Sequence, residues 1–361
     1  MSRALFLFRS GRRSRLDASG PREFLYGYSE LERDGSAVAM IEEGEIGLAR
    51  PWSRAFEAIA GRVARATGVH ARVLAAFYRH RDVLADHDAL VATTHTFGFA
   101  LAALRRIGLL GSDVIVMTMG ILPADPSPAR LHLVRWLLAG TTLAALSKPE
   151  ACWLRLKLGP GVRIIDFAFG VDLDFWRPSS VDRDDTVLSV GNDPNRDFNA
   201  LVAAWRPEFP TLEIITTIPI ASDKPNVRIL RGDWRSEAIS DHALRAKLQR
   251  ARLVVVPLRD TLQPAGQSAA LQAMACGRPV VMSANRGCWD REMLYRHDAC
   301  RFVVPGDPVE LGNVISALLA DPKGAEALGA RARLMLEQEQ VSSANMASQF
   351  RALIPGLQPA S

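Results

Sequence analysis

Short apolar runs rich in β-branched and aromatic residues alternate along this chain with longer segments whose apolar residues recur at helical spacing. This alternation is typical of βαβ units and predicts parallel sheets covered by helices. The runs in the first half predict strands near residues 4–8, 38–41, 89–93, 114–117, 143–146 and 163–167. Those in the second half predict strands near residues 186–190, 213–217, 227–230, 253–256, 280–282 and 302–304. The pattern therefore predicts an α/β protein with two lobes of similar size.

The break between the two sets of strands has the composition of an exposed connector. It contains Gly170, Pro178, two serines and a cluster of acidic residues. Such stretches commonly join domains. We expect one Rossmann-like lobe over residues 1–178, a second over residues 179–345, and a C-terminal tail, residues 346–361, that crosses back to the first lobe.

Composition supports a globular protein. The chain has 361 residues, of which 48% are apolar and 23% charged, and this excludes a collagen-like, a disulfide-rich or a mainly disordered class. The four cysteines form no CxxC pair, so neither a zinc site nor a disulfide framework is expected. The apolar runs at residues 4–8 and 136–146 are too short for a signal peptide or a membrane span. We expect a cytoplasmic protein whose only membrane contact is peripheral, on the inner face.

The net charge of +5 is concentrated in one segment, residues 50–82, which carries seven arginines against Glu57 and Asp82. Apolar and aromatic residues are interleaved with these arginines, and this predicts a basic amphipathic helix that binds an anionic membrane surface. The alternative is an ordinary helix packed on its lobe with a solvated basic face. Nucleic-acid binding is not expected, because no recognised motif accompanies the charge.

Ligands of α/β folds bind beyond the carboxyl ends of the strands, so the loops there are the candidates for chemistry. In residues 253–283 a buried strand is followed by a polar loop, by Gly266 at a tight turn, and by Gln267 and Ser268 at the start of a helix. The free amides and the dipole of this helix end favour a phosphate. The sequence therefore predicts an anion site at this turn.

The block LQAMACGRPVV at residues 271–281, with FGVDLDFWRP at the connector and SVGNDPNRD after residue 188, resembles the retaining GT-B glycosyltransferases of the family 4 type. The resemblance implies a nucleotide-sugar donor held by the C-terminal lobe and an acceptor held by the N-terminal lobe. It also implies no tightly bound cofactor or metal, with a UDP- or GDP-sugar as substrate.

This chain departs from the family pattern at its usual pair of glutamates. The second position is Gln272, and the first falls at or near Pro264, with Gln263 as the closest polar neighbour. An amide at Gln272 can still hydrogen-bond the hydroxyls of a ribose. The alternative is that Gln272 is a solvated helix residue.

The loop from Gly191 to Asp197 resembles the family's diphosphate loop, with Asn192 at the arginine position and Arg196 where a lysine is expected. A fixed cation in a dry site stabilises a departing diphosphate, and Arg196 is the candidate. The alternative is a surface arginine paired with Asp193 or Asp197. Arg259 is a candidate for a second cation.

In the first lobe, His95 directly follows a predicted strand and precedes a helix, and family members often have a histidine in this loop. It is expected to contact the acceptor or relay a proton, or else to be hydrogen-bonded within the loop. Gly20 and Arg12, in the loop after the first strand, are further candidates for acceptor binding, although the arginines there could simply be solvated.

Together these features predict a glycosyltransferase that moves a sugar from a nucleotide-diphosphate donor to a saccharide or a lipid-linked acceptor in bacterial envelope or exopolysaccharide synthesis, with retention. Two alternatives remain open: a non-catalytic scaffold or regulatory subunit with the GT-B fold, and a GT-B-fold sugar-nucleotide epimerase.

Overall fold

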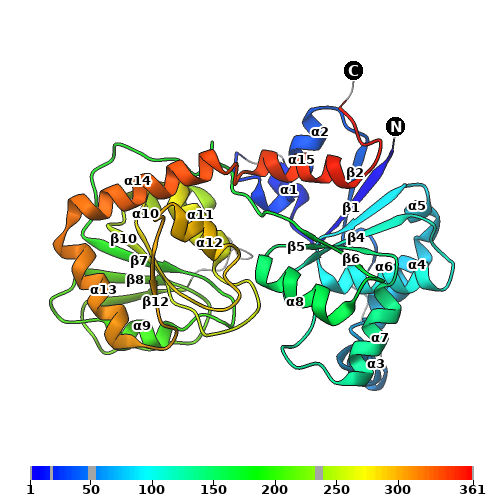
Figure 1. The fold of residues 1–361 in the computed structure, drawn as a ribbon, viewed down its shortest axis with the longest axis horizontal. Helices are drawn as coiled ribbons and strands as arrows, with labels where there is room; N and C mark the ends of the chain where they lie inside the picture. The colour runs from blue at the N-terminus through cyan, green and yellow to red at the C-terminus, as the bar shows by residue number, and fades with distance from the viewer. Residues whose placement is uncertain (1, 17–18, 48–53, 232–238, 360–361) are drawn as a thin grey trace. The chain divides into compact units, whose positions relative to one another are not determined.

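The computed structural model describes residues 2–16, 19–47, 54–231 and 239–359, and divides them into two compact units. Unit 1 comprises Met1–Phe169 and Ser343–Ser361, and unit 2 comprises Gly170–Ser342. Each unit contains a six-stranded parallel sheet, with helices around it (Figure 1). The predicted two-lobe α/β architecture is confirmed, and so is the presence of all twelve predicted strands.

The sheet of unit 1 has the strand order β2-β1-β3-β4-β5-β6. Its strands are β1 (Ala4–Phe8), β2 (Val38–Glu42), β3 (Ala89–Ala92), β4 (Asp113–Thr118), β5 (Thr142–Ala145) and β6 (Arg163–Asp166). The central strands β1 and β3 are buried along their whole length. This explains why they appear in the sequence as continuous apolar runs rather than as alternating ones.

The helices of unit 1 fall between these strands, apart from the last, which comes from the C-terminal end of the chain. They are α1 (Arg13–Leu16), the 3-10 helix η1 (Glu23–Leu25), α2 (Tyr28–Arg33), α3 (Arg54–Thr67), α4 (Ala71–Arg79), α5 (Arg81–Ala85), α6 (His95–Arg106), α7 (Pro128–Leu138), α8 (Lys148–Leu158) and α15 (Ser343–Leu353).

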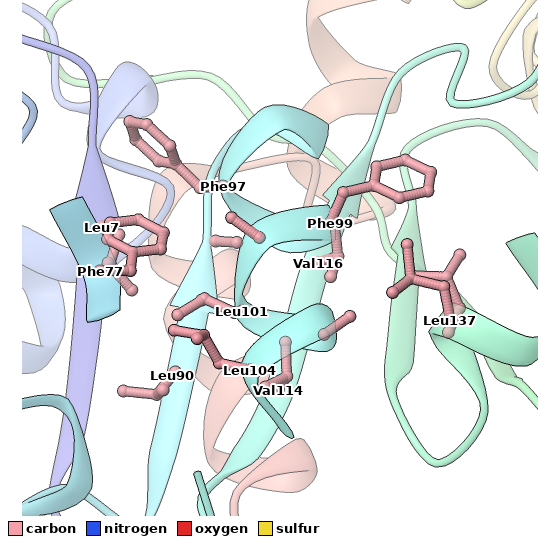
Figure 2. Packing of buried hydrophobic residues seen from close by; sticks show 14 of the residues in the cluster. Leu7, Phe77, Leu90, Phe97, Phe99, Leu101, Leu104, Val114, Val116 and Leu137 are labelled. Carbon is pink, nitrogen blue, oxygen red and sulfur yellow. The ribbon is translucent and has the colours of Figure 1, made fainter. Parts of the chain in front are cut away.

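One apolar core binds these helices to the sheet. Phe77 of α4 and Phe97 of α6 meet edge to face at 5.6 Å between ring centroids, beside Leu7 of β1 (Figure 2). At Gly98 a Cβ would lie 2.3 Å from Val116 Cγ1, so only glycine lets α6 approach β4 this closely. The core thereby fixes the start of α6 against the carboxyl end of the sheet.

The basic segment differs from the single helix that its charge pattern predicts. It forms three helices, α3, α4 and α5. The chain turns at Gly68, with φ +79°, between α3 and α4, and His80 ends α4 and precedes α5. Val73 and Phe77 of α4 are buried in the core, whereas Ile59 and Val63 of α3 are 58% and 44% exposed. Arg50 and Trp52 lie outside the described residues.

The sheet of unit 2 has the strand order β12-β11-β10-β7-β8-β9. Its strands are β7 (Thr186–Val190), β8 (Thr211–Ile215), β9 (Val227–Leu230), β10 (Leu253–Val256), β11 (Val280–Ser283) and β12 (Arg301–Val303). The helices are α9 (Phe198–Ala204), α10 (Asp241–Arg250), α11 (Gln267–Ala275), α12 (Arg291–Arg296), α13 (Pro308–Ala320) and α14 (Pro322–Gln338). Strand β8 ends before Thr216 and Thr217, which instead hydrogen-bond the loop after β7.

The connector belongs to unit 2, so the first boundary lies at Phe169 rather than at the expected Pro178. Trp176 is fully buried, and the Arg333 guanidinium donates through Nη1 to the carbonyls of Leu173 and Trp176 and to that of Ala275, at 3.2, 2.9 and 3.0 Å. These contacts bind the connector to α11 and α14.

The C-terminal helix α15 returns to unit 1, where it contacts α2 (Figure 1). Phe350 packs against Phe6 at 5.0 Å and against Phe167 at 4.9 Å between ring centroids. A Cβ on Gly27 would lie 2.5 Å from the backbone nitrogen of Ala347, so α15 lies directly on the start of α2. No helix of the described ranges is both long and apolar enough to cross a bilayer.

Candidate functional site

In unit 2 the strand order reverses direction between β7 and β10, which pair side by side. The chain continues outward from β7 through β8 to β9 on one side, and from β10 through β11 to β12 on the other. Open α/β sheets bind their ligands at such a switch point, beyond the carboxyl ends of the two strands. The loops that meet there are Gly191–Asp197 after β7 and the loop that leads from β10 into α11.

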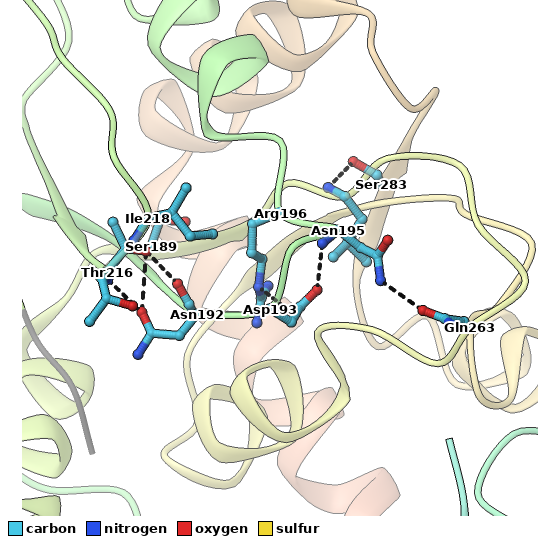
Figure 3. Close-up of polar contacts among 12 residues, drawn as sticks. Ser189, Asn192, Asp193, Asn195, Arg196, Thr216, Ile218, Gln263 and Ser283 are labelled. Atoms are coloured by element: carbon cyan, nitrogen blue, oxygen red, sulfur yellow. Dashed lines mark hydrogen bonds and ion pairs between the residues drawn. The ribbon is translucent and has the colours of Figure 1, made fainter. Parts of the chain in front are cut away.

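A network of hydrogen bonds holds the loop after β7. Asn192 Oδ1 accepts from the Thr217 amide at 2.6 Å and from Thr216 Oγ1 at 3.3 Å, and Thr216 Oγ1 also donates to the Gly191 carbonyl at 2.7 Å (Figure 3). Further along, Asn195 Nδ2 donates to Gln263 Oε1 at 3.3 Å. Asn192 thus ties its loop to the loop after β8.

The guanidinium of Arg196 lies between the two glycines of the switch point. A Cβ on Gly191 would lie 2.2 Å from Arg196 Nε, and one on Gly266 would lie 3.2 Å from Nη1. The side chain pairs with Asp193, at 2.9 Å between Nε and Oδ2, and is only 3% exposed. The alternative interpretation, a surface arginine paired with Asp193 or Asp197, is therefore wrong about exposure, although the ion pair with Asp193 is present.

Burial lowers the pKa of Arg196, while the Asp193 carboxylate opposes this shift. Nη1 is buried and has no hydrogen-bond partner within the described part of the chain. A desolvated cation exerts a stronger field on a nearby anion than a solvated one does. Arg196 therefore supplies a positive charge directly behind the start of α11.

The start of α11 has the geometry of an anion site. Gly266 has φ +72° and caps the helix without a side-chain hydrogen bond, and a Cβ there would lie 2.6 Å from Val256 Cγ1. The first amides of a helix have no partner within it, and their dipoles add to the positive field at this end. Gln267, the first residue of α11, is buried, and Ser268 is half-buried.

The remaining candidates of unit 2 precede α11 in the chain or lie within this helix. Gln272 is buried in α11 with 5% exposure, so it is not a solvated residue. Arg259 is exposed, and its backbone amide donates to the Asn195 carbonyl at 2.9 Å. Gln263 is exposed in the loop before α11 and Pro264 is half-buried. Neither position carries a carboxylate.

In unit 1 the switch point lies between β1 and β3. Thr93 Oγ1 donates to the Leu7 carbonyl at 2.7 Å and so joins the carboxyl ends of the two strands. Thr94 caps α6, and His95 follows as its first residue, with an exposed side chain. Partial burial lowers the pKa of His95, and the positive charges of Arg9 and His70 lower it further. The structure thus places His95 at the carboxyl edge of the sheet in its own unit.

The loop after β1 is held by an internal carboxylate. Glu42 accepts hydrogen bonds from the backbone amides of Gly11, Arg12 and Arg13. The half-buried guanidinium of Arg12 lies 5.4 Å from the centre of the Phe24 ring, so it is not simply solvated. Gly20 is half-buried in the bend before η1.

Sequence reasoning missed two groups at these edges. Asp193 was considered only as the partner of a surface arginine, but it pairs with the buried one. Glu150 is buried at the carboxyl edge of unit 1, where Oε1 accepts from the Gly120 amide at 2.6 Å. Burial raises the pKa of Glu150 to about 7, although this hydrogen bond opposes the shift. Ser147 and Glu150 have the spacing of a capping pair at the start of a helix. Glutamate at such a position is commonly exposed, so nothing in the sequence indicated that Glu150 is buried.

Within the described segments, no group of three or more histidine, cysteine, aspartate or glutamate side chains could hold a metal ion.

Two Rossmann-like units, each with its own switch point, define the GT-B class, and the comparisons with solved structures agree. The chain is similar to sucrose-phosphate synthase from Thermosynechococcus elongatus, with a TM-score of 0.72, 18% identity, and coverage of 97% of this chain and 98% of that one. It is also similar to Anabaena HepE in complex with UDP-glucose, with a TM-score of 0.70, 16% identity, and coverage of 98% and 99%. A third structure, α,α-trehalose 6-phosphate synthase from Burkholderia multivorans, gives a TM-score of 0.63, 14% identity, and coverage of 98% and 96%.

A match to a known family lies within unit 2. Residues 186–321, from the start of β7 to the residue after α13, match the family described as glycosyl transferases group 1. The predicted resemblance to glycosyltransferases is confirmed over these residues of unit 2, and the similar structures support the GT-B fold for the two units. No curated protein matches the chain in sequence.

Proposed function

We propose that unit 2 binds the diphosphate of a nucleotide-sugar donor at the start of α11. The observation that carries this proposal is Arg196, a buried cation between Gly191 and Gly266 at the switch point. Free helix amides and a desolvated positive charge are the features that stabilise a phosphate. The donor-bound state of HepE, a similar fold in complex with UDP-glucose, supports a UDP-sugar as the first donor to test.

The proposed reaction breaks the bond between the anomeric carbon and the diphosphate oxygen, and the electron pair leaves with the diphosphate. An acceptor hydroxyl forms the new bond to the same face of the sugar, and its proton passes to the departing phosphate. The field of Arg196 and the amides of Gln267 and Ser268 stabilise the charge that develops on the leaving group. No carboxylate nucleophile is assigned, and this is consistent with Gln272 and Pro264 at the positions of the family's glutamates.

A binding experiment tests the donor site. We expect UDP or GDP to raise the melting temperature of the protein, and Arg196→Ala to weaken nucleotide binding by about 10- to 100-fold, since hydrogen bonds to charged groups contribute about 1.5–3 kcal/mol. Arg228→Ala is the matched control, because Arg228 is exposed on β9, away from the switch point. If no nucleotide stabilised the protein, the transferase proposal would fail and the scaffold alternative would replace it.

A product analysis tests the reaction itself. With a nucleotide sugar and a saccharide acceptor, NMR spectra of the product should show the donor's anomeric configuration retained. An inverted product would exclude the proposed same-face transfer. Conversion of the donor sugar into its epimer without any acceptor would instead support the epimerase alternative.

We also propose that α3 contacts an anionic membrane surface, which would bring a lipid-linked acceptor of envelope or exopolysaccharide synthesis to the enzyme on the cytoplasmic side. Ile59, Arg62 and Val63 are exposed and recur at helical spacing, so apolar and cationic side chains share one face. Arg65 is exposed one turn beyond Arg62.

Flotation with vesicles that contain anionic lipid tests this contact. Replacing Arg62 and Arg65 by glutamine should reduce the bound fraction, because each cation near such a surface contributes about 1 kcal/mol. The control replaces the exposed Arg163 and Arg228, which keeps the net charge of the two variants equal. Equal flotation of the two variants would refute the membrane proposal.

A further inference from the structure

The backbone around Arg196 is paired with the loop after β10. Arg196 and Leu258 form an isolated antiparallel bridge, and the Asp197 amide donates to the Pro257 carbonyl at 3.0 Å. These contacts fix the point from which the Arg196 side chain starts. The guanidinium lies at the end of a long, flexible side chain, so its direction depends on the groups that surround it.

Asp193 is the charged group that contacts this guanidinium. Its Oδ2 lies 2.9 Å from Arg196 Nε, while its Oδ1 accepts from the Asn195 amide at 3.0 Å (Figure 3). The Asp193 carbonyl also accepts from the Arg196 amide at 3.1 Å, which closes a turn. Both carboxylate oxygens are therefore in use within one turn, because one holds the turn itself and the other holds the cation.

The ion pair occupies only one edge of the guanidinium. A Cβ on Gly266 would lie 3.2 Å from Arg196 Nη1, so this nitrogen is on the side of the α11 start. Nη1 is buried and makes no hydrogen bond to the described residues. A guanidinium is planar and its N–H groups point in different directions, so Asp193 can hold Nε while Nη1 stays beside α11.

The two charges of the pair differ in their exposure to solvent. The side chain of Arg196 is 3% exposed, and that of Asp193 is 34% exposed. Water weakens the field of a charge much more than the protein interior does. The pair is formally neutral, but its positive member therefore acts more strongly on an anion at the start of α11.

We propose that Asp193 is a positioning residue of the donor site, which holds the guanidinium of Arg196 beside the start of α11 before a diphosphate binds. This inference rests on the proposed function, because it concerns the same donor site. It also gives a reason for arginine at position 196. An ammonium carries all its N–H groups on one nitrogen, and the adjacent carboxylate would draw that single atom away from α11.

A binding cycle with UDP, or with GDP if that nucleotide binds more tightly, tests whether Asp193 acts through Arg196. Asp193→Asn keeps an oxygen that can accept from the Asn195 amide but removes the ion pair, and we expect nucleotide binding to weaken about tenfold. In an Arg196→Ala background the same change should have no further effect on binding. The control is Asp223→Asn, which removes the same charge from an exposed residue of unit 2.

The shape of the cation provides a second measurement, which a purely structural role of Asp193 would not affect. Arg196→Lys should weaken nucleotide binding, and Asp193→Asn in that background should strengthen it, because the ammonium is no longer drawn toward the carboxylate. The sign of the Asp193→Asn effect thus reverses between the two backgrounds. Melting curves without nucleotide check that each variant is folded.

The outcomes separate this inference from the proposed function. If nucleotide binding fell with Arg196→Ala but was unchanged or tighter with Asp193→Asn, the positioning role would be overturned and the donor site would stand. Equal effects of Asp193→Asn in the wild type and in the Arg196→Ala background would overturn it too, because the carboxylate would then act independently of the guanidinium. If neither UDP nor GDP bound the wild type, the proposed function would fail, and this inference with it.

Discussion

Arg196 lies directly over Gly191: a Cβ on this glycine would be 2.2 Å from Arg196 Nε. The position after β7 must therefore be glycine for the buried cation to keep its place. The side chain of the next residue, Asn192, instead accepts a hydrogen bond from the Thr217 amide. The cation and the glycine are one structural unit.

A double-mutant cycle tests this unit. Gly191→Ala should lower the free energy of unfolding by about 1–3 kcal/mol, since the added methyl group overlaps the guanidinium. In an Arg196→Ala background the same change should cost less than about 0.5 kcal/mol, because the overlapping atoms are gone. Urea unfolding measures both. Gly161→Ala, where a Cβ meets nothing within 4 Å, is the control, and equal costs in the two backgrounds would contradict the contact.

Arg333 should be important for stability although it lies outside both candidate sites. Arg333→Met leaves the carbonyls of Leu173, Trp176 and Ala275 without their donor, and we expect a loss of about 2–4 kcal/mol. Arg331, two residues earlier on α14, forms an exposed ion pair with Asp298, and Arg331→Met should cost less than about 1 kcal/mol. Chemical denaturation distinguishes the two, and similar costs would show that Arg333 does not hold the connector.

Glu150 should make stability depend on pH. The folded state holds its proton up to about pH 7, whereas an ordinary glutamate ionises near 4.5, so stability falls as pH rises between these values. Glu150→Gln has no carboxyl group to ionise, so its free energy of unfolding relative to that of the wild type should rise by about 2–3 kcal/mol between pH 5 and pH 8. The exposed Glu208→Gln should show no such gain. Parallel stability curves for wild type and Glu150→Gln would contradict the raised pKa.

The cysteines should differ sharply in reactivity. Cys152 is exposed, whereas burial raises the pKa of Cys288 to about 12 and also raises that of Cys300, and Cys276 is buried. The thiolate is the reactive form, so a thiol reagent at pH 8 should label one cysteine rapidly in the folded protein and the other three only on unfolding. Cys152→Ser should abolish the rapid phase, and its persistence would show that a buried thiol becomes accessible.

The strands were predictable because buried strands of a parallel sheet consist of continuous apolar residues, as at 253–256 and 89–92. The anion site at α11 was predictable from Gly266, since its turn and the helix start are adjacent in sequence. The burial of Arg196 was not, because it depends on Gly191 and Gly266 approaching from different strands.

The basic segment shows where the sequence pattern failed to predict the local structure, because three helices stand where one was expected. Charge and apolar spacing over residues 50–82 predict one amphipathic helix, but breaks at Gly68 and His80 divide the segment. Tertiary packing decided the outcome, because Phe77 is buried in the core while Ile59 of α3 is 58% exposed.

Unit 2 begins and ends at one place. Val171 pairs with Ser342, the Val171 amide donates to the Val341 carbonyl at 3.2 Å, and a Cβ on Gly170 would collide with the Ser342 backbone. The chain therefore leaves and re-enters unit 1 through two adjacent strands of backbone. A polypeptide of residues 170–342 alone would therefore have its two termini side by side, which is the arrangement in which a domain can be inserted within a loop of another one.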